Sequence, residues 1–161
     1  MLRRGALVKF STRATYGLKA LLYLAQAYHE RAVSASQIAK EEGLSPAYLE
    51  QILHLLKKKQ WVKSLRGPSG GYVLARKPSE VRIGPVLRDL EGKSAVRSKA
   101  RARGPAVSGN APSIAAAIFW ERAQREYAEL LDKPTLKALL DEARELQKQS
   151  PASARKLNFN I

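Results

Sequence analysis

The sequence predicts a mostly α-helical fold with a small β-hairpin wing, followed by a long C-terminal helix. Three features of the 161-residue chain indicate this arrangement. Two short amphipathic segments flank a glycine-containing turn between residues 33 and 60, two β-rich segments flank "GPSGG" between residues 61 and 76, and a strong helical pattern runs from residue 114. Helix, short turn and helix is the order of a helix-turn-helix, and a hairpin after it makes the motif winged.

The first expected helix covers residues 11–30, "STRATYGLKALLYLAQAYHE". Ser11 or Thr12 can cap its start, because a side-chain oxygen can accept a hydrogen bond from a free backbone N–H of the first turn. Apolar residues occur at helical spacing on most of its sides. A helix that is apolar almost all round is expected to be buried by more than one neighbour.

The next segment predicts two helices with a tight break. Ser34 and Gln37 have the spacing of a capping box, and Gly43 ends the first helix because glycine tolerates a positive φ. Ser45 then caps the second helix, and Pro46 stands at its first position, where no N–H is needed. The expected buried stripe of this helix is Leu49, Ile52, Leu53 and Leu56. Its opposite face is Ala47, Glu50, Gln51, His54, Lys57 and Lys58.

The two strands are expected at residues 61–66 and 72–76, with "GPSGG" as the loop between them. A glycine-rich loop can also cradle a nucleotide phosphate, but such a loop leads from a strand into a helix. Here the glycines lead into a second strand, which favours a hairpin tip that can approach a nucleic-acid backbone. A short amphipathic helix at residues 84–91 completes a winged domain at residues 1–92.

The rest of the chain divides into three parts. Residues 93–113 are small, basic or helix-breaking and are expected to form a flexible basic linker. Residues 114–149 contain the long helix, a break at Pro134 and a following helix. Residues 150–161 are expected to form a frayed tail.

Basic residues are concentrated in the winged domain and the linker. The whole chain has a net charge of +15. Residues 1–92 carry 16 Lys and Arg against 7 Asp and Glu, residues 93–112 carry 5 against none, and residues 113–161 carry 8 against 7. This asymmetry predicts a part that binds a polyanion and a nearly neutral part that packs.

Other classes of function find little support in the sequence. The chain has no cysteine, and its two histidines, His29 and His54, are too few and too far apart for a metal site. It has neither a nucleophile motif nor a cofactor loop, so no enzymatic activity is expected. No stretch approaches the ~20 apolar residues of a membrane span and no secretory signal is seen. We therefore expect a cytoplasmic protein with no membrane partner.

Four stretches resemble one family of proteins: "STRATYGLKALLYLA", "SASQIAKEEGLSPAYLEQILHLLKK", "WVKSLRGPSGGYVLARKPSEVRIGPVLRDLEG" and "FWERAQREYAELLDKPTLKAL". They are similar to the winged helix-turn-helix bacterial transcriptional regulators of the IscR/CymR type (the Rrf-two family). "YLEQIL" followed by "LRGPSGGY" is a specific pair of motifs. The resemblance implies a homodimeric, sequence-specific transcriptional regulator, in our interpretation a repressor, that binds a near-palindromic operator in double-stranded DNA.

The resemblance and the side-chain chemistry together indicate the DNA contacts. Gln51 can pair with adenine, and Glu50 can accept only from a donor such as the cytosine amino group. Tyr48 and Ser45 suit phosphate contacts, and the charge of Arg66 suits a narrow minor groove. The other expected contacts are Gly67, Ser69, Gly70, Gly71 and Tyr72 in the wing, and Lys9 and Arg13 beside the first helix. A solvated helix carboxylate remains the alternative for Glu50, and ordinary surface charge remains the alternative for Lys9 and Arg13.

The resemblance also implies that the long helix is a dimerisation helix that crosses its partner. Its expected interface residues are Ile114, Ile118, Phe119, Ala123, Tyr127 and Leu130. Many members of the family hold a [2Fe–2S] cluster through three cysteines, whereas this chain has Ala100, Ala106 and Ala111 close to that spacing. No cofactor is therefore expected in this chain.

Two explanations for the missing cysteines stay open. The protein can be a natural cluster-free member of the family, switched by a small-molecule effector or a regulatory protein. Alternatively, alanines can have replaced the cysteines of an iron–sulfur-sensing regulator. A further alternative is a regulator that is controlled by a protein partner, which docks on its C-terminal helix.

Overall fold

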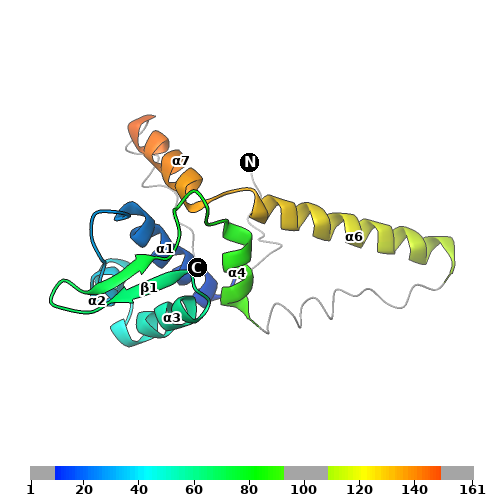
Figure 1. Ribbon diagram of the computed structural model, residues 1–161. Helices are drawn as coiled ribbons and strands as arrows, with labels where there is room; N and C mark the ends of the chain where they lie inside the picture. The colour runs from blue at the N-terminus through cyan, green and yellow to red at the C-terminus, as the bar shows by residue number, and fades with distance from the viewer. Residues whose placement is uncertain (1–9, 93–108, 150–161) are drawn as a thin grey trace.

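The computed structural model describes residues 10–92 and 109–149, which form six helices and one two-stranded antiparallel sheet (Figure 1). In chain order the elements are α1 (Thr12–Gln26), α2 (Ala35–Glu42), α3 (Pro46–Lys58), β1 (Val62–Leu65), β2 (Gly71–Leu74), α4 (Ile83–Glu91), α6 (Ala111–Asp132) and α7 (Leu136–Gln149). The expected mostly helical fold with a small hairpin is confirmed. The predictions for Lys9, Ala100, Ala106, most of the linker and the tail lie outside the described residues.

The helix-turn-helix forms with the predicted caps. Ser34 Oγ accepts a hydrogen bond from the Gln37 N–H at 3.1 Å, and Ser45 Oγ accepts one from the backbone N–H three residues on at 3.2 Å. Gly43 ends α2 with a left-handed φ of 66°, a conformation that glycine adopts at no steric cost. Only half of the predicted capping box forms, because the side-chain oxygen of Gln37 accepts from Arg31 Nη1 at 3.3 Å.

The glycine-rich loop is the tip of a hairpin, as predicted. The register of the two strands is Val62↔Leu74, Lys63↔Val73, Ser64↔Tyr72 and Leu65↔Gly71. Val33 adds one antiparallel bridge on the other side of Tyr72, with N···O distances of 3.0 and 2.9 Å. A Cβ at Gly71 would lie 2.6 Å from the Val33 carbonyl oxygen. Glycine is therefore required where this third segment approaches the hairpin.

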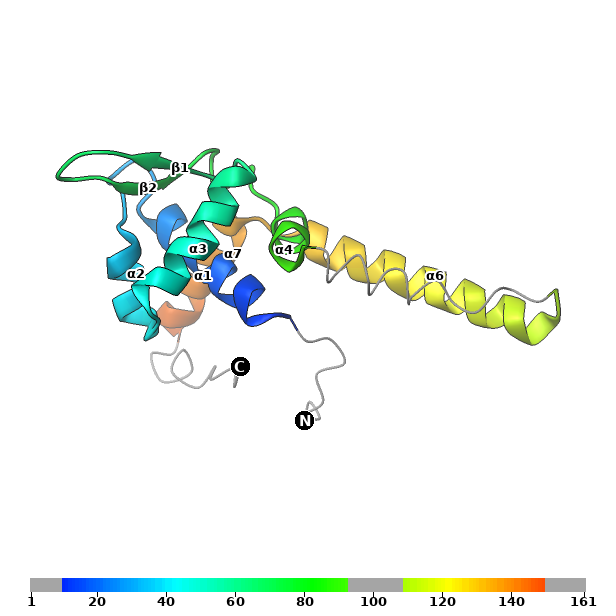
Figure 2. The same ribbon diagram turned by 90° about the horizontal axis from the view of Figure 1, so that it is seen from below.

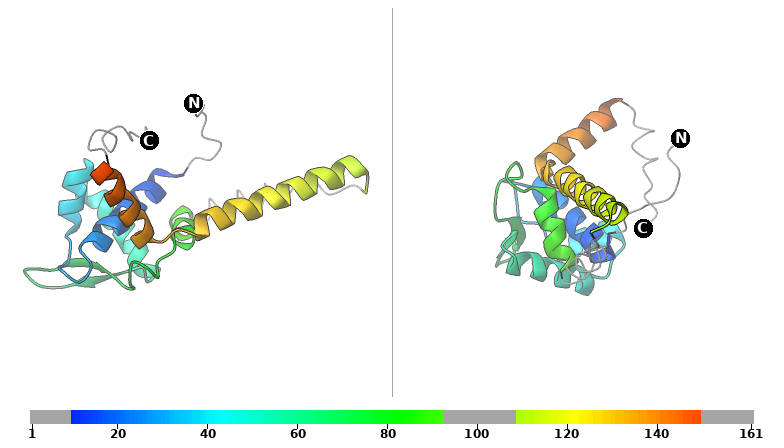
Figure 3. Two further views of the ribbon diagram at one scale, coloured as in Figure 1. Left: turned by 90° about the horizontal axis from the view of Figure 1, so that it is seen from above. Right: turned by 90° about the vertical axis from the view of Figure 1, so that its right-hand side faces the viewer.

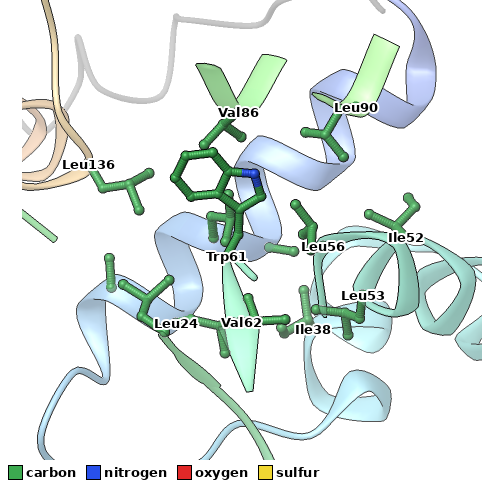
Figure 4. Close-up of a cluster of buried hydrophobic side chains, with 14 of the residues drawn as sticks. Leu24, Ile38, Ile52, Leu53, Leu56, Trp61, Val62, Val86, Leu90 and Leu136 are labelled. Carbon is green, nitrogen blue, oxygen red and sulfur yellow. The ribbon is translucent and has the colours of Figure 1, made fainter. Parts of the chain in front are cut away.

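α1 lies at the centre of the core, where it contacts α3, β2, α4 and α7. Figure 4 shows buried side chains from α1, α2, α3, β1, α4 and α7 in one cluster with Trp61, whose Nε1 donates to Asp89 Oδ2 at 2.9 Å. The predicted stripe of α3 is part of this core: Leu49, Ile52, Leu53 and Leu56 are buried. Burying this stripe fixes the rotation of α3 and turns its polar side outward.

Two helix boundaries differ by more than two residues from those expected. α1 ends at Gln26 rather than at residue 30, and a turn follows in which His29 has a left-handed φ of 69°. α6 begins at Ala111 rather than at residue 114, because Asn110 Oδ1 accepts from the Ser113 N–H at 3.0 Å and caps the helix. The last three residues of the expected linker 93–113 are therefore helical.

α6 extends away from the winged part, whereas α7 turns back and packs against α1 (Figures 2 and 3). None of the α6 residues is buried. Asp132, the last residue of α6, is held by two arginines. Arg88 donates to its two carboxylate oxygens at 2.9 and 3.3 Å, and Arg82 Nη1 donates to its backbone carbonyl at 3.1 Å. A Cβ at Gly84 would lie 1.8 Å from Asp132 Oδ1, so glycine makes room for this junction.

We expect Gly17→Ala to lower the free energy of unfolding by about 1–3 kcal/mol, the usual cost of overpacking. A Cβ at Gly17 would lie 2.6 Å from both Leu90 methyl carbons, and Leu90 is fully buried. This cost opposes the advantage of about 1 kcal/mol that alanine has over glycine in a helix. Thermal and urea denaturation of the variant measure the change. Adding Leu90→Val should recover part of the loss, and a Gly17→Ala chain as stable as the parent would contradict the tight contact.

Candidate nucleic-acid interface

The outer side of α3 carries a polar stripe. Glu50, His54 and Lys57 are spaced by four and three residues, which places them on one side of a helix, and all three are exposed. Gln51 is exposed beside this stripe. The predicted reading residues Glu50 and Gln51 thus lie together on the surface of α3, opposite its buried leucines.

The predicted phosphate contacts at the start of α3 are held by neighbouring groups. Ser45 Oγ caps the helix and is exposed, so its hydroxyl hydrogen is free to donate outward. Tyr48 is half-buried, with its ring edge-on to Tyr16 at 6.5 Å between centroids. Lys19 Nζ lies 5.4 Å from the Tyr16 ring centroid. These contacts fix the position of Tyr48 before any ligand is bound.

The hairpin tip and the N-terminal end of α3 lie on the same side of the molecule, opposite α6 (Figures 1 and 2). At the tip, Arg66, Gly67 and Ser69 are exposed and Gly70 is half-buried. Arg66 forms no ion pair within the described ranges. The predicted wing and the N-terminal end of the predicted reading helix thus both lie on the side of the molecule away from α6.

One hydrogen bond and one electrostatic interaction connect α3 with the hairpin. Lys57 Nζ donates to Ser64 Oγ at 2.7 Å. Tyr72, the register partner of Ser64, has its pKa raised by burial and by the negative charge of Glu50. The negative charge of Glu50 on α3 is therefore felt by the hydroxyl of Tyr72 on the hairpin.

Arg13 has partners within the protein. Its Nε donates to the Leu90 carbonyl at 2.6 Å and its Nη2 to the Glu91 carbonyl at 3.0 Å. Glu91 Oε1 in turn accepts from the Ser11 N–H at 2.7 Å. A guanidinium at the C-terminal end of α4 is also favoured by the helix dipole. This geometry supports a structural role for Arg13 in joining α1 to α4.

Exposed and half-buried apolar side chains form a seam along α6. They follow the alternating spacing of four and three residues typical of a coiled-coil interface: Ala116, Trp120, Ala123, Tyr127 and Leu130. Phe119 borders the seam, and its ring contacts Trp120 with centroids 5.2 Å apart. Phe119, Trp120 and Leu130 are 60%, 54% and 66% exposed.

The seam differs in part from the set predicted for dimerisation. Ile114 and Ile118 are exposed as well, but at 3.6 residues per turn they lie on a different side of α6. Trp120 is not in the predicted set, although its spacing of four residues from Ala116 and three from Ala123 is that of an interface residue. At the inner end of the seam, burial and the negative charge of Glu91 raise the pKa of Tyr127, so this part of α6 lies close to α4.

The chemistry of the chain does not fit an iron–sulfur cluster. There is no thiol anywhere in the sequence, and the described residues contain no group of three or more His, Cys, Asp or Glu that could hold a metal ion. Ala111 is the first residue of α6 and offers no ligand atom in its side chain. Over the same ranges, no helix is long and apolar enough to cross a membrane.

The family model of Rrf2, described as "Iron-dependent Transcriptional regulator", matches residues 10–142. The chain belongs to the Rrf2 family. The match contains α1 to α4, the hairpin, all of α6 and the start of α7. The motif-based resemblance seen in the sequence is thereby confirmed, as is the winged helix-turn-helix fold.

Individual relatives agree with this assignment. The chain is 41% identical over 85 residues to the HTH-type transcriptional regulator CymR of Bacillus subtilis, which is 53% of this chain and 62% of that protein. Among solved structures, IscR of T. potens matches with a TM-score of 0.71 at 37% identity, covering 89% of this chain and 94% of that one. CymR of B. subtilis, described as the global cysteine regulator, matches with a TM-score of 0.71 at 33% identity. This match covers 84% of this chain and 98% of that one. Matches to three curated relatives span only 50–62% of their length.

We expect Arg13→Gln to lower the free energy of unfolding by about 1–2 kcal/mol, because it removes hydrogen bonds from a charged donor to two carbonyls. Chemical denaturation measures this. The same variant should keep the salt dependence of DNA binding shown by the parent, since a residue that contacts no phosphate releases no counterion. A stable variant with a shallower salt dependence would instead support the phosphate contact predicted from the sequence.

Proposed function

We propose that this protein is a sequence-specific DNA-binding transcriptional regulator that acts as a homodimer on a near-palindromic operator. The observation that carries the proposal is an exposed polar stripe on α3 together with an exposed hairpin tip that lies, like the N-terminal end of α3, on the side of the molecule away from α6. A helix of this kind enters the major groove, while the wing reaches the neighbouring backbone or minor groove. The net charge of +15 favours such a polyanionic partner.

The residues of α3 contact different parts of the DNA because their side chains differ in chemistry. Gln51 can offer both a donor and an acceptor to adenine, whereas the carboxylate of Glu50 accepts only and suits the amino group of cytosine. A carboxylate is repelled by phosphates, so Glu50 disfavours every sequence that leaves it without a donor. Ser45 and Tyr48, at the start of α3, place their hydroxyls for the backbone.

The wing supplies binding strength with less sequence preference. Arg66 is exposed at the narrow tip of the hairpin, where the small residues Gly67, Ser69 and Gly70 allow close approach. A guanidinium at such a tip is attracted to the negative potential of a narrow minor groove. Gly71 and Tyr72 hold the tip in place through the bridge to Val33.

The seam of α6 supports the homodimer. A second copy of the same helix would cover Phe119, Trp120 and Leu130, which are exposed in the single chain. Two winged parts carried by one pair of helices can occupy half-sites one turn apart, about 34–36 Å. A dimer that covers this length of duplex excludes other proteins from it, and on this ground we propose repression as the outcome.

The switching signal follows from what the chain lacks. Without cysteine, iron–sulfur control through thiolates has no ligands here, so a small-molecule effector or a regulatory protein is the proposed signal. The exposed seam also fits the alternative in which another protein docks on α6. The oligomeric state of the purified chain separates these possibilities.

Glu50→Ala and Arg66→Ala should affect DNA binding in different ways. Removing Glu50 should relax the preference at one base position in each half-site, with a loss of discrimination of about 1–3 kcal/mol. Removing Arg66 should weaken binding to every duplex. Selection of bound sequences from a random duplex pool, followed by titration of the enriched operator, measures both effects. Lys133→Gln, at the end of α6, is the matched control. If both variants select and bind like the parent, α3 and the wing are not the reading surface.

The double change Phe119→Glu and Leu130→Glu should convert the dimer to a monomer, because it places charge within the seam and at its border. Sedimentation measures the mass, and operator affinity should fall by about 10²–10⁴ with the loss of the linked second half-site. Arg125→Glu, on the charged side of α6, is the control and should remain dimeric. A parent chain that sediments as a monomer would favour docking of another protein on α6.

A further inference from the structure

A basic groove lies between the C-terminal end of α3 and the base of the hairpin. It has a volume of about 690 Å³ and is lined by Lys57, Gln60, Val62, Lys63, Ser64, Ala75 and Arg76. Three of these side chains are cationic and none is acidic. In the sequence these residues cannot be distinguished from ordinary surface charge, since Lys57 belongs to a run of three lysines that suits any helix end.

The structure distinguishes the lysines of that run. Lys59 is neutralised by Asp89 at 2.9 Å. Lys57 instead turns toward the hairpin and donates to Ser64 Oγ at 2.7 Å. On the far side of the groove, the guanidinium of Arg76 lies 5.4 Å from the centroid of the Trp61 ring. Within residues 10–92 and 109–149, Lys57, Lys63 and Arg76 form no ion pair.

The position of the groove suggests what neutralises these charges. The major and minor grooves of a duplex are separated by one sugar–phosphate strand. If α3 enters the major groove and the wing reaches the neighbouring minor groove, that strand must pass between α3 and the hairpin. The basic groove opens between these two elements.

We propose that the basic groove binds a phosphodiester of the DNA strand that passes between α3 and the wing. Lys57 and Lys63 supply point charges, Arg76 supplies a planar fork of donors that suits phosphate oxygens, and Ser64 supplies a hydroxyl. The inference rests on the proposed function and adds to it a backbone contact that carries no base preference. It extends the interface from the reading end of α3 to its opposite end.

The double variant Lys57→Gln/Lys63→Gln tests the groove on the enriched operator, with Lys133→Gln, which removes a lysine outside the groove, as the control. The slope of log affinity against log salt concentration reports the number of phosphate contacts. For a dimer that loses one phosphate contact in each protomer, this slope should be smaller in magnitude by about 1.8. The ratio of its affinities at 50 and 200 mM salt should therefore fall about twelvefold relative to the parent, while the selected base sequence is unchanged. Both side chains are exposed, so the melting temperature should stay close to that of the parent.

A second measurement locates the contact on the DNA. Methylphosphonates, which lack the phosphate charge, are introduced one at a time along the operator. Each half-site should contain one position at which the methylphosphonate weakens the parent more than the double variant, which keeps Arg76 and Ser64 in the groove. If no position behaves this way, or if the double variant keeps the parent's slope, the groove proposal is wrong although the protein binds DNA. A slope reduced equally by Lys133→Gln also refutes it, and a parent that binds no duplex refutes both this inference and the proposed function.

Discussion

The packing of one side of α3 is the constraint on which the rest of the structure depends. Leu49, Ile52, Leu53 and Leu56 are each at most 1% exposed, and interiors this tightly packed leave little freedom to rotate. Because these side chains are fixed against α1, α2 and the hairpin, Glu50 and Lys57 are fixed on the outside. The surface proposed to read DNA is therefore a product of the core rather than of mobile side chains alone.

Much of this arrangement can be predicted from local chemistry. The serine caps, Gly43 and the apolar stripe of α3 act within a few residues of one another, so their effects are visible in the sequence. The glycine-rich loop was recognisable as a hairpin because β-forming segments flank it on both sides. Family membership then followed from motifs that span the winged part.

Other features depend on contacts between distant segments and were not predictable in this way. The partners of Arg13 lie 77 and 78 residues away, so its carbonyl contacts could not be distinguished from surface charge. Lys57 and Lys59 look equivalent in a run of lysines until the fold places Ser64 beside one and Asp89 beside the other. α6 begins three residues earlier than expected because Asn110 caps it and Pro112 stands in its first turn, where a missing N–H does no harm.

The junction at Asp132 has a consequence for assembly. This residue is bound by two arginines and lies against a glycine, at the root of the arm that would carry a second copy. A short, multiply bonded root limits bending, so the separation of the two DNA-reading surfaces would be set by the chain itself rather than adjusted by each binding site. Such a protein would tolerate changes in half-site sequence more readily than a single inserted base pair between the half-sites.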